Sequence, residues 1–159
     1  MYRLRQSPLG AAAAKSGGAK NIPRVQLLGS GTILREALAA AEILEREHDI
    51  AADVWSVTSF TELRRDGLEC ECWNREHPDD PRRSWVEQCL ANAGGPVIAA
   101  SDYVRAVADL IRGWVPGKYV ALGTDGFGRS DTRSALRSYF GVDAQGIAQA
   151  AARATQLAG

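Results

Sequence analysis

A glycine-rich polar turn near the C-terminal end of the chain carries the residues best suited to chemistry. Residues 123–131 read Gly-Thr-Asp-Gly-Phe-Gly-Arg-Ser-Asp. They follow a short apolar run, residues 119–122, that is typical of a buried strand, and they precede residues 132–140, which are typical of a helix. α/β proteins place ligands or partners at such strand-to-helix turns. We therefore expect this turn to carry much of the function.

The spacing within the turn resembles that of a phosphate-binding loop. Gly123 is followed, after an interval of four residues, by Gly128, Arg129 and Ser130; a P-loop has glycine, lysine and a hydroxyl residue there. The planar guanidinium of Arg129 is a poor substitute for that lysine, and Asp125 would repel phosphate. No later strand is expected that could supply an aspartate for magnesium. Nucleotide hydrolysis is therefore disfavoured, and an anion- or nucleotide-binding module using residues 123–130 stays as the alternative function.

Two other groups of residues could suggest a ligand. Residues 29–31 read Gly-Ser-Gly at a strand-to-helix turn, but Leu34 replaces the third glycine of a dinucleotide fingerprint, and no acidic residue ends the next strand. The second group contains potential zinc ligands: Cys70, Cys72, His77 and Cys89. Because Cys70 and Cys72 are two positions apart on an expected helix, they point to different sides. We predict neither a dinucleotide site nor a metal site.

The composition excludes several classes of protein. The 159 residues are enough for one domain with its own core, and 45% of them are hydrophobic. Nineteen basic and nineteen acidic residues cancel, which argues against a nucleic-acid partner. No apolar run approaches the ~20 residues of a membrane helix. The three cysteines are too few for a disulfide framework, so we expect a cytoplasmic location.

Apolar runs and amphipathic stretches alternate along the chain. The expected strands are residues 25–28, 53–58, 97–100 and 119–122. The expected helices follow Ser30 or Thr32, span residues 59–76, 84–92, 132–140 and 143–157, or begin at Ser101-Asp102. Strand–helix–strand units of this length place their strands in parallel. The pattern predicts an α/β fold with a mostly parallel sheet between helices.

Two of these helices are predicted with specific inward faces. In residues 84–92 the apolar face comprises Trp85, Val86, Cys89 and Leu90. In the helix that begins at Ser101-Asp102 it comprises Val104, Val107, Ala108 and Ile111.

The N-terminal segment differs from the rest of the chain. Residues 1–24 contain no acidic residue and several glycines and prolines. We predict a short edge strand at residues 2–5 and then a flexible Ala/Gly/Ser loop. Residues 25–159 are expected to form the α/β domain.

Several stretches together resemble the C-terminal domain of the homodimeric type of pyruvate dehydrogenase, the decarboxylating subunit of the pyruvate dehydrogenase complex. The resemblance runs from about Met1 to the end, and its last motif is long and specific. The stretches that carry it are residues 25–31, 53–63, 73–74 with His77-Pro78, 101–103, and 122–131, followed by Thr132-Arg133.

This resemblance implies a transketolase-like C-terminal fold. That fold has three α/β/α layers with a mixed sheet of about five strands, in which residues 2–5 would be an antiparallel edge strand. In the full family enzyme, the ylide of thiamine diphosphate attacks pyruvate and carbon dioxide leaves. The remaining two-carbon unit is then transferred to a lipoyl group on the acetyltransferase.

The chain departs from the family at the cofactor motif. That motif is Gly-Asp-Gly followed later by Asn, and this sequence has no Gly-Asp-Gly. The family's activating glutamate and its histidines belong to two earlier domains. We therefore expect this chain to bind no cofactor and to catalyse nothing alone, whereas thiamine diphosphate and magnesium belong to the full enzyme.

The leading hypothesis is a C-terminal domain or fragment of pyruvate dehydrogenase that serves dimer assembly and shapes the active site. The expected partners are the remaining pyruvate dehydrogenase domains, in the same or a separate chain, a homodimer partner, and the dihydrolipoyl acetyltransferase. A chain that restores catalysis to a separate thiamine-binding partner and a fragment without its own function are further alternatives. The candidate contact residues are Asp125, Phe127, Arg129, Ser130 and Asp131.

Overall fold

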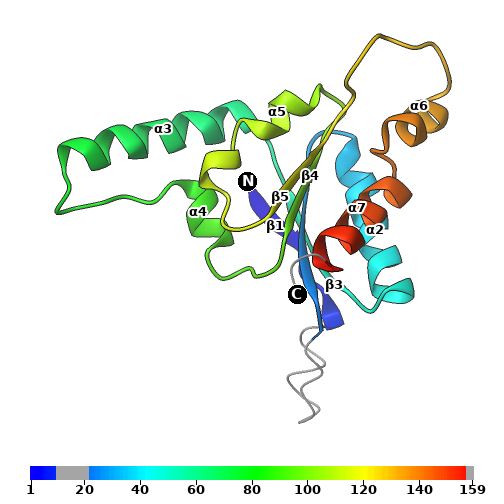
Figure 1. Cartoon of the computed structure of the whole chain (residues 1–159), viewed down its shortest axis with the longest axis horizontal. Helices are drawn as coiled ribbons and strands as arrows, with labels where there is room; N and C mark the ends of the chain where they lie inside the picture. Colours follow the sequence, from blue (N-terminus) through cyan, green and yellow to red (C-terminus); the bar gives the residue numbers. More distant parts are fainter. Residues whose placement is uncertain (10–21, 157–159) are drawn as a thin grey trace.

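The computed structural model describes residues 1–9 and 22–156, which form one five-stranded sheet between helices (Figure 1). The strand order is β1-β3-β2-β4-β5, with β1 antiparallel to β3 and every other pair parallel. The predicted mixed, mostly parallel sheet is thus confirmed. Most of the expected Ala/Gly/Ser loop lies outside the described residues. The strands are β1 (Tyr2–Arg5), β2 (Arg24–Gly29), β3 (Ala51–Ser56), β4 (Val97–Ala100) and β5 (Tyr119–Leu122).

Helices cover both faces of the sheet. In Figure 1, α3, α4 and α5 lie on one side and α2, α6 and α7 on the other. None of the helices in residues 1–9 and 22–156 is long and apolar enough to span a membrane. The helices are α2 (Ile33–Glu47), α3 (Phe60–Glu76), α4 (Trp85–Leu90), α5 (Arg105–Asp109), the 3-10 helix η1 (Arg112–Trp114), α6 (Arg133–Phe140) and α7 (Ala144–Gln156).

Two hydrophobic cores fill the spaces between the sheet and its helices. Successive side chains of a strand point to opposite faces, and β2 shows this directly: Leu27 packs in the core beneath α2 and α7, whereas Leu28 packs in the core beneath α3, α4 and α5. Both side chains are fully buried. The expected three-layer α/β/α architecture follows from this arrangement.

A buried carboxylate ties the N-terminal segment to the sheet. Asp53 on β3 is 1% exposed. Its oxygens accept hydrogen bonds from the backbone N–H of Ser7 (2.8 Å), from Nη1 of Arg24 (2.7 Å) and from Nε2 of Gln26 (3.3 Å). A buried charge requires such partners, so these bonds hold the chain beyond β1 against β2 and β3.

The helix expected to begin at Ser101-Asp102 starts later. α5 spans Arg105–Asp109, and Val104 takes the N-cap position without a side-chain capping bond. Thr124 engages the preceding backbone. Its N–H donates to the carbonyl of Tyr103 at 2.9 Å, and its hydroxyl donates to the carbonyl of Asp102 at 2.9 Å. Contacts with a distant loop thus set where this helix begins.

The predicted inward face of α4 was partly wrong. In α4, Val86 and Leu90 are buried, but Trp85 is 46% exposed and Cys89 is only partly buried. The indole Nε1–H of Trp85 donates to the carbonyl of Met1 at 2.9 Å. This bond keeps the ring at the edge of the core, where its polar atom finds a partner.

Candidate functional site: the loop between β5 and α6

The loop that follows β5 projects from the carboxyl edge of the sheet before the chain enters α6 (Figure 1). Because β2, β4 and β5 are parallel, the segments that leave them meet at this edge. The backbone N–H of Ser101 after β4 donates to the carbonyl of Leu122 at 3.2 Å. The glycine-rich turn of residues 123–131 is therefore a surface projection at the edge of the sheet where the carboxyl ends of the parallel strands meet.

The base of the loop is fixed against the segment between β4 and α5. Thr124 donates both its N–H and its hydroxyl to that segment. A Cβ at Gly123 would lie 2.6 Å from the backbone nitrogen of Arg105 and from the carbonyl oxygen of Tyr103. Glycine at position 123 is what allows the two backbones to approach so closely.

Asp125 is engaged within the domain. Its Oδ1 accepts the backbone N–H of Arg105 at 2.8 Å, and its Oδ2 accepts the Nε–H of Arg105 at 3.1 Å. Since Arg105 is the first residue of α5, Asp125 supplies the capping oxygen that Val104 cannot. Asp125 therefore holds the base of the loop to a helix start.

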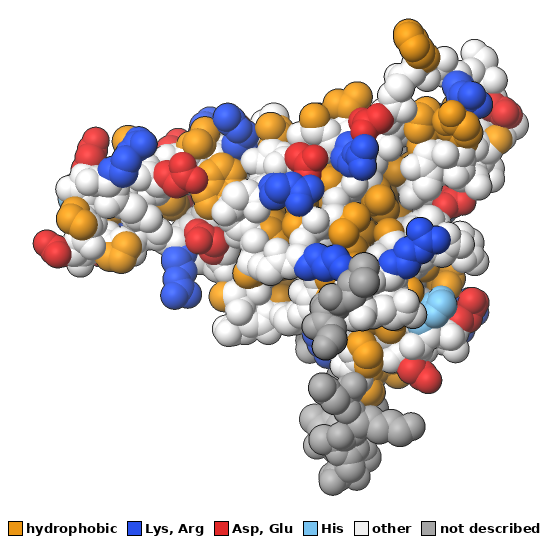
Figure 2. Space-filling model, in the orientation of Figure 1, with side chains coloured by type: hydrophobic (Ala, Val, Ile, Leu, Met, Phe, Trp, Pro, Cys, Tyr) orange, Lys and Arg blue, Asp and Glu red, His pale blue; other side chains and the backbone are white. Residues whose placement is uncertain are grey.

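The tip of the loop is a single exposed aromatic residue. Phe127 is 96% exposed. Gly126 on one side adopts φ 101°, which other residues rarely do, and a Cβ at Gly128 on the other side would meet nothing within 4 Å. Figure 2 shows hydrophobic surface at the end of this projection, away from the body of the domain. The loop thus holds a large apolar side chain in solvent.

The other three candidate residues follow the tip toward α6. The guanidinium of Arg129 lies 3.8 Å from the ring centroid of Tyr139. Ser130 is exposed. The carboxylate of Asp131 accepts the N–H of Thr132 at 2.7 Å. The five candidates therefore lie along one loop without converging on one point, and their intramolecular partners Arg105 and Tyr139 had no signal in the sequence.

The loop geometry differs from that of a phosphate-binding loop. In a P-loop the second glycine and the lysine open the helix. Here α6 begins at Arg133, beyond Gly128 and Arg129, and the hydroxyl of Thr132 caps it by accepting the N–H of Ala135 at 3.3 Å. Arg129 lies over an aromatic ring and not at a helix start.

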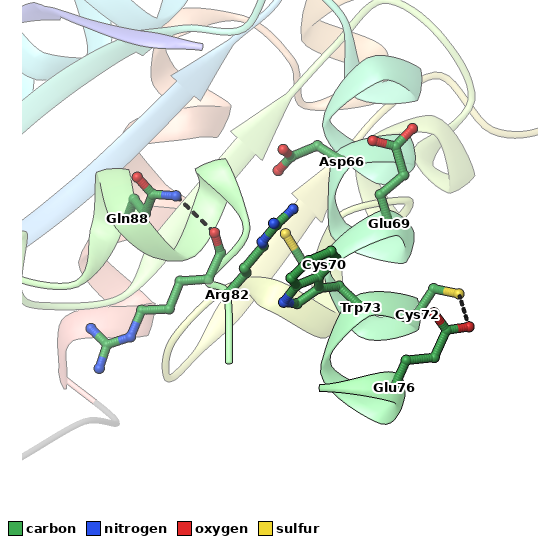
Figure 3. A pocket seen from close by; sticks show the side chains of 9 residues that line it. Asp66, Glu69, Cys70, Cys72, Trp73, Glu76, Arg82 and Gln88 are labelled. Atoms are coloured by element: carbon green, nitrogen blue, oxygen red, sulfur yellow. Dashed lines mark hydrogen bonds between the residues drawn. The ribbon is translucent and has the colours of Figure 1, made fainter. Parts of the chain in front are cut away.

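A hollow of about 670 Å³ lies along the outer half of α3, away from the loop (Figure 3). Cys70 and Cys72 both line it, but their side chains point in different directions, as predicted. Burial and then the carboxylate of Asp66 raise the pKa of the Cys70 thiol above its usual value. A thiol with a raised pKa is a poor nucleophile. Across the described ranges, no group of three or more His, Cys, Asp or Glu residues could hold a metal ion.

The outer part of α3 is braced by stacked rings and polar contacts. The rings of Trp73 and His77 stack with centroids 3.7 Å apart, and the guanidinium of Arg82 lies 3.3 Å from the centroid of the Trp73 ring. Asn74 bonds both the carbonyl (2.9 Å) and the N–H (2.6 Å) of Arg82. These residues, which include the Trp-Asn and His-Pro motifs of the sequence, hold the segment between α3 and α4 in place.

Comparison with protein families gives a match over most of the chain. Residues 11–143 match the family model of the transketolase-like TK C-terminal domain. The chain belongs to this family. Its fold agrees: a solved structure described as a split gene transketolase, inactive beta4 tetramer, superposes with a TM-score of 0.59 at 25% identity, over 84% of this chain and 40% of that one.

Curated relatives that match this chain include bacterial proteins named pyruvate dehydrogenase E1 component. The one from Pseudomonas aeruginosa is 58% identical over 132 residues, which is 82% of this chain and 15% of the relative. The one from Cupriavidus necator is 55% identical over 135 residues, 84% of this chain and 15% of the relative. The one from Escherichia coli K12 is 51% identical over 130 residues, which is 80% of this chain and 14% of the relative. The chain thus spans about 15% of the length of the relatives it matches.

Proposed function

We propose that this chain acts as the C-terminal domain of a thiamine-diphosphate-dependent, acetyl-transferring pyruvate dehydrogenase. In that enzyme it would support dimer assembly and shape the outer part of the active site. Membership of the transketolase-like C-terminal family and 51% to 58% identity to pyruvate dehydrogenase E1 components support the proposal. The chemistry on pyruvate and the transfer to the lipoyl group of the acetyltransferase would involve the remaining domains.

We propose that thiamine diphosphate and magnesium are bound by the other domains of the enzyme and not by this chain. The sequence has no Gly-Asp-Gly motif, and the described residues provide no cluster of metal ligands for magnesium. Burial also raises the pKa of the Cys70 and Cys89 thiols, which makes both of them poor nucleophiles. We therefore assign no step of the reaction to residues of this chain.

The observation that carries the proposal is the contrast between the fixed base and the exposed tip of the loop. Asp125 and Thr124 hold the base to the β4–α5 segment, while Phe127 is 96% exposed. A large apolar side chain that is held in solvent is an anchor suited to a pocket on a partner. Phe127 would fill such a pocket, and Arg129, Ser130 and Asp131 would make polar contacts around it, with Arg129 able to bind a carboxylate.

A chimaeric enzyme tests this proposal. The matching segment of the Pseudomonas aeruginosa relative is replaced by this chain, and carbon dioxide release from pyruvate and the sedimentation coefficient are measured. Arg129→Ala should lower turnover or shift the dimer toward monomer, because it removes a contact at the interface. Arg153→Ala changes an exposed arginine of α7 and serves as the control. Unchanged activity together with unchanged sedimentation of the Arg129 variant would contradict the proposal.

A further inference from the structure

A pocket of about 330 Å³ lies beneath the projecting loop, at the carboxyl edge of the sheet. Four segments that are distant in sequence contribute to its lining: the turns after β2 and β4, the loop after β5, and α6. Among the lining residues are Thr32, Asp102, Thr124, Arg133, Leu136 and Phe140.

The position of this pocket in the sheet is one that favours ligand binding. From β2 the chain turns to β3 on one side, and from β4 it turns to β5 on the other. The boundary between β2 and β4 is therefore the topological switch point of the sheet. Open α/β sheets bind ligands in the crevice outside the carboxyl ends of the strands at such a point. Thr32 and Asp102 follow the two strands that flank it.

Internal bonds brace the wall of this pocket. Arg137 donates to the carboxylate of Glu36 at 2.7 Å and to the hydroxyl of Thr32 at 3.2 Å. The same hydroxyl donates to Oδ2 of Asp102 at 3.3 Å. The charge of Arg137 is therefore matched by Glu36, and α6 is joined to the turn after β2.

Arg133 differs from Arg137 in having no partner among the residues that the structure describes. It lines the pocket from the first turn of α6 and is exposed. Within the described part of the chain, no hydrogen bond or ion pair engages its guanidinium. Leu136 and Phe140 on the same helix, together with Val142 beyond it, give the pocket an apolar component. A free guanidinium thus lies beside an apolar surface in a braced hollow.

We propose that this pocket binds a small carboxylic acid with an apolar body. The carboxylate would bind the fork of Arg133, and the apolar body would lie against Leu136 and Phe140. The pocket volume of about 330 Å³ lies at the lower end of the range for small-molecule sites, so it fits a small ligand. Asp102 in the lining adds a negative charge and so disfavours doubly charged anions such as phosphate.

The first experiment compares three probes on the full chain. Benzoate, the neutral isostere benzamide and inorganic phosphate are titrated separately into the ¹⁵N-labelled protein, and backbone amide shifts are followed. Benzoate should bind with a millimolar dissociation constant and shift the amides of Thr32, Thr124 and Leu136. Benzamide should bind about tenfold more weakly, since it lacks the charge-assisted bond, and phosphate should bind more weakly than benzoate. Equal affinity for benzoate and benzamide, tighter binding of phosphate, or benzoate shifts confined to other regions would overturn the proposal.

A pair of arginine variants then tests the assigned cation. Arg133→Gln should weaken benzoate binding about tenfold and leave benzamide binding unchanged. Arg153→Gln removes a different exposed arginine, on α7, and should change neither. Retention of wild-type benzoate affinity by Arg133→Gln, or an equal loss in both variants, would overturn the proposal. Because the probe comparison uses the unaltered protein, it decides the matter even if a variant fails to fold.

Discussion

Asp125 and Arg105 join a loop to the start of a helix across a sequence separation of 20 residues. The Asp125 carboxylate accepts the backbone N–H of Arg105 at 2.8 Å and its Nε–H at 3.1 Å. Val104, at the N-cap position of α5, has no side chain able to do this. One carboxylate therefore caps α5 and also fixes the loop that presents Phe127.

Removal of the Asp125 carboxylate, which caps α5, should lower the stability of the domain. Asp125→Ala should lower the free energy of unfolding by ~1 kcal/mol, the usual effect of losing an N-cap oxygen. Urea titration followed by circular dichroism measures this change. Ser130→Ala, at an exposed position of the same loop, should stay within about 0.5 kcal/mol of the wild type. Equal stability of the two variants would mean that the Asp125 bonds do not stabilise the fold.

The contact between Arg129 and Tyr139 should be measurable as a coupling energy. Their separation of 3.8 Å from guanidinium carbon to ring centroid is within cation–π range, which at an exposed site contributes ~0.5–1 kcal/mol. A double-mutant cycle with Arg129→Gln and Tyr139→Leu isolates this energy from the free energies of unfolding. If the two single changes were additive within error, the guanidinium would gain nothing from the ring.

A buried glycine of α3 should not tolerate even a methyl group. A Cβ at Gly67 would lie 2.3 Å from the ring of Trp114, which packs against the core beneath α3, α4 and α5. Alanine gains ~1 kcal/mol of helix propensity over glycine, but overpacking costs ~1–3 kcal/mol. We expect Gly67→Ala to be destabilised on balance, as measured by thermal and urea unfolding.

Gly113 offers the matched control for Gly67. A Cβ at Gly113 would meet nothing within 4 Å, so Gly113→Ala should be close to neutral in the same assays. A Gly67→Ala protein as stable as the Gly113→Ala protein would show that Trp114 can move aside without cost.

Tyr119 should make stability depend on pH at the alkaline end. Burial and then the nearby Asp109 carboxylate raise the pKa of its hydroxyl well above the usual value, and the hydroxyl donates to the carbonyl of Ala108 at 2.6 Å. Because folding favours the protonated phenol, its contribution is fully present below about pH 10, the ordinary tyrosine value, and is lost as pH rises toward the folded-state pKa.

Tyr119→Phe isolates this effect. The variant should lose ~1 kcal/mol near neutral pH with the hydrogen bond. The difference in unfolding free energy between wild type and variant should shrink above about pH 10. Urea titrations of both proteins from pH 7 to pH 11 provide the test. A difference that stays constant over this range would show that the phenol titrates normally in the fold.

Local sequence signals predicted most of the fold. The strands at residues 97–100 and 119–122 occur with the predicted bounds, since each is a short apolar run next to proline or glycine. The side chains of Ser59, Thr132 and Asp143 accept capping bonds at the starts of α3, α6 and α7, whereas Thr32, an expected cap of α2, makes no such bond. The predicted start of α5 was wrong because Thr124 donates hydrogen bonds to the backbone just before this helix. No periodicity in the sequence reveals those bonds.

The candidate site could be located from sequence but not assembled. Its glycines and charges indicated the loop, and the resemblance identified the family. The separate partners of its charged residues, Arg105 for Asp125 and Tyr139 for Arg129, depend on tertiary packing. The same holds for the pocket around Arg133, whose lining comes from four segments.

Association of this chain with the other domains of a pyruvate dehydrogenase tests the central claim most directly. The Pseudomonas aeruginosa relative is prepared without its matching segment, and sedimentation equilibrium measures its association with this chain in wild-type, Phe127→Ala and Leu68→Ala forms. Leu68 is an exposed apolar residue of α3, away from the loop. Carbon dioxide release from pyruvate, measured in the same mixtures, shows whether association also restores catalysis.

We expect the wild-type chain and Leu68→Ala to bind the truncated relative with equal affinity. Phe127→Ala should bind at least tenfold more weakly, since a central aromatic anchor contributes upward of ~2 kcal/mol. If the wild-type chain does not associate, or if the two variants bind equally well, the projecting loop is not the contact that joins this domain to the rest of a pyruvate dehydrogenase.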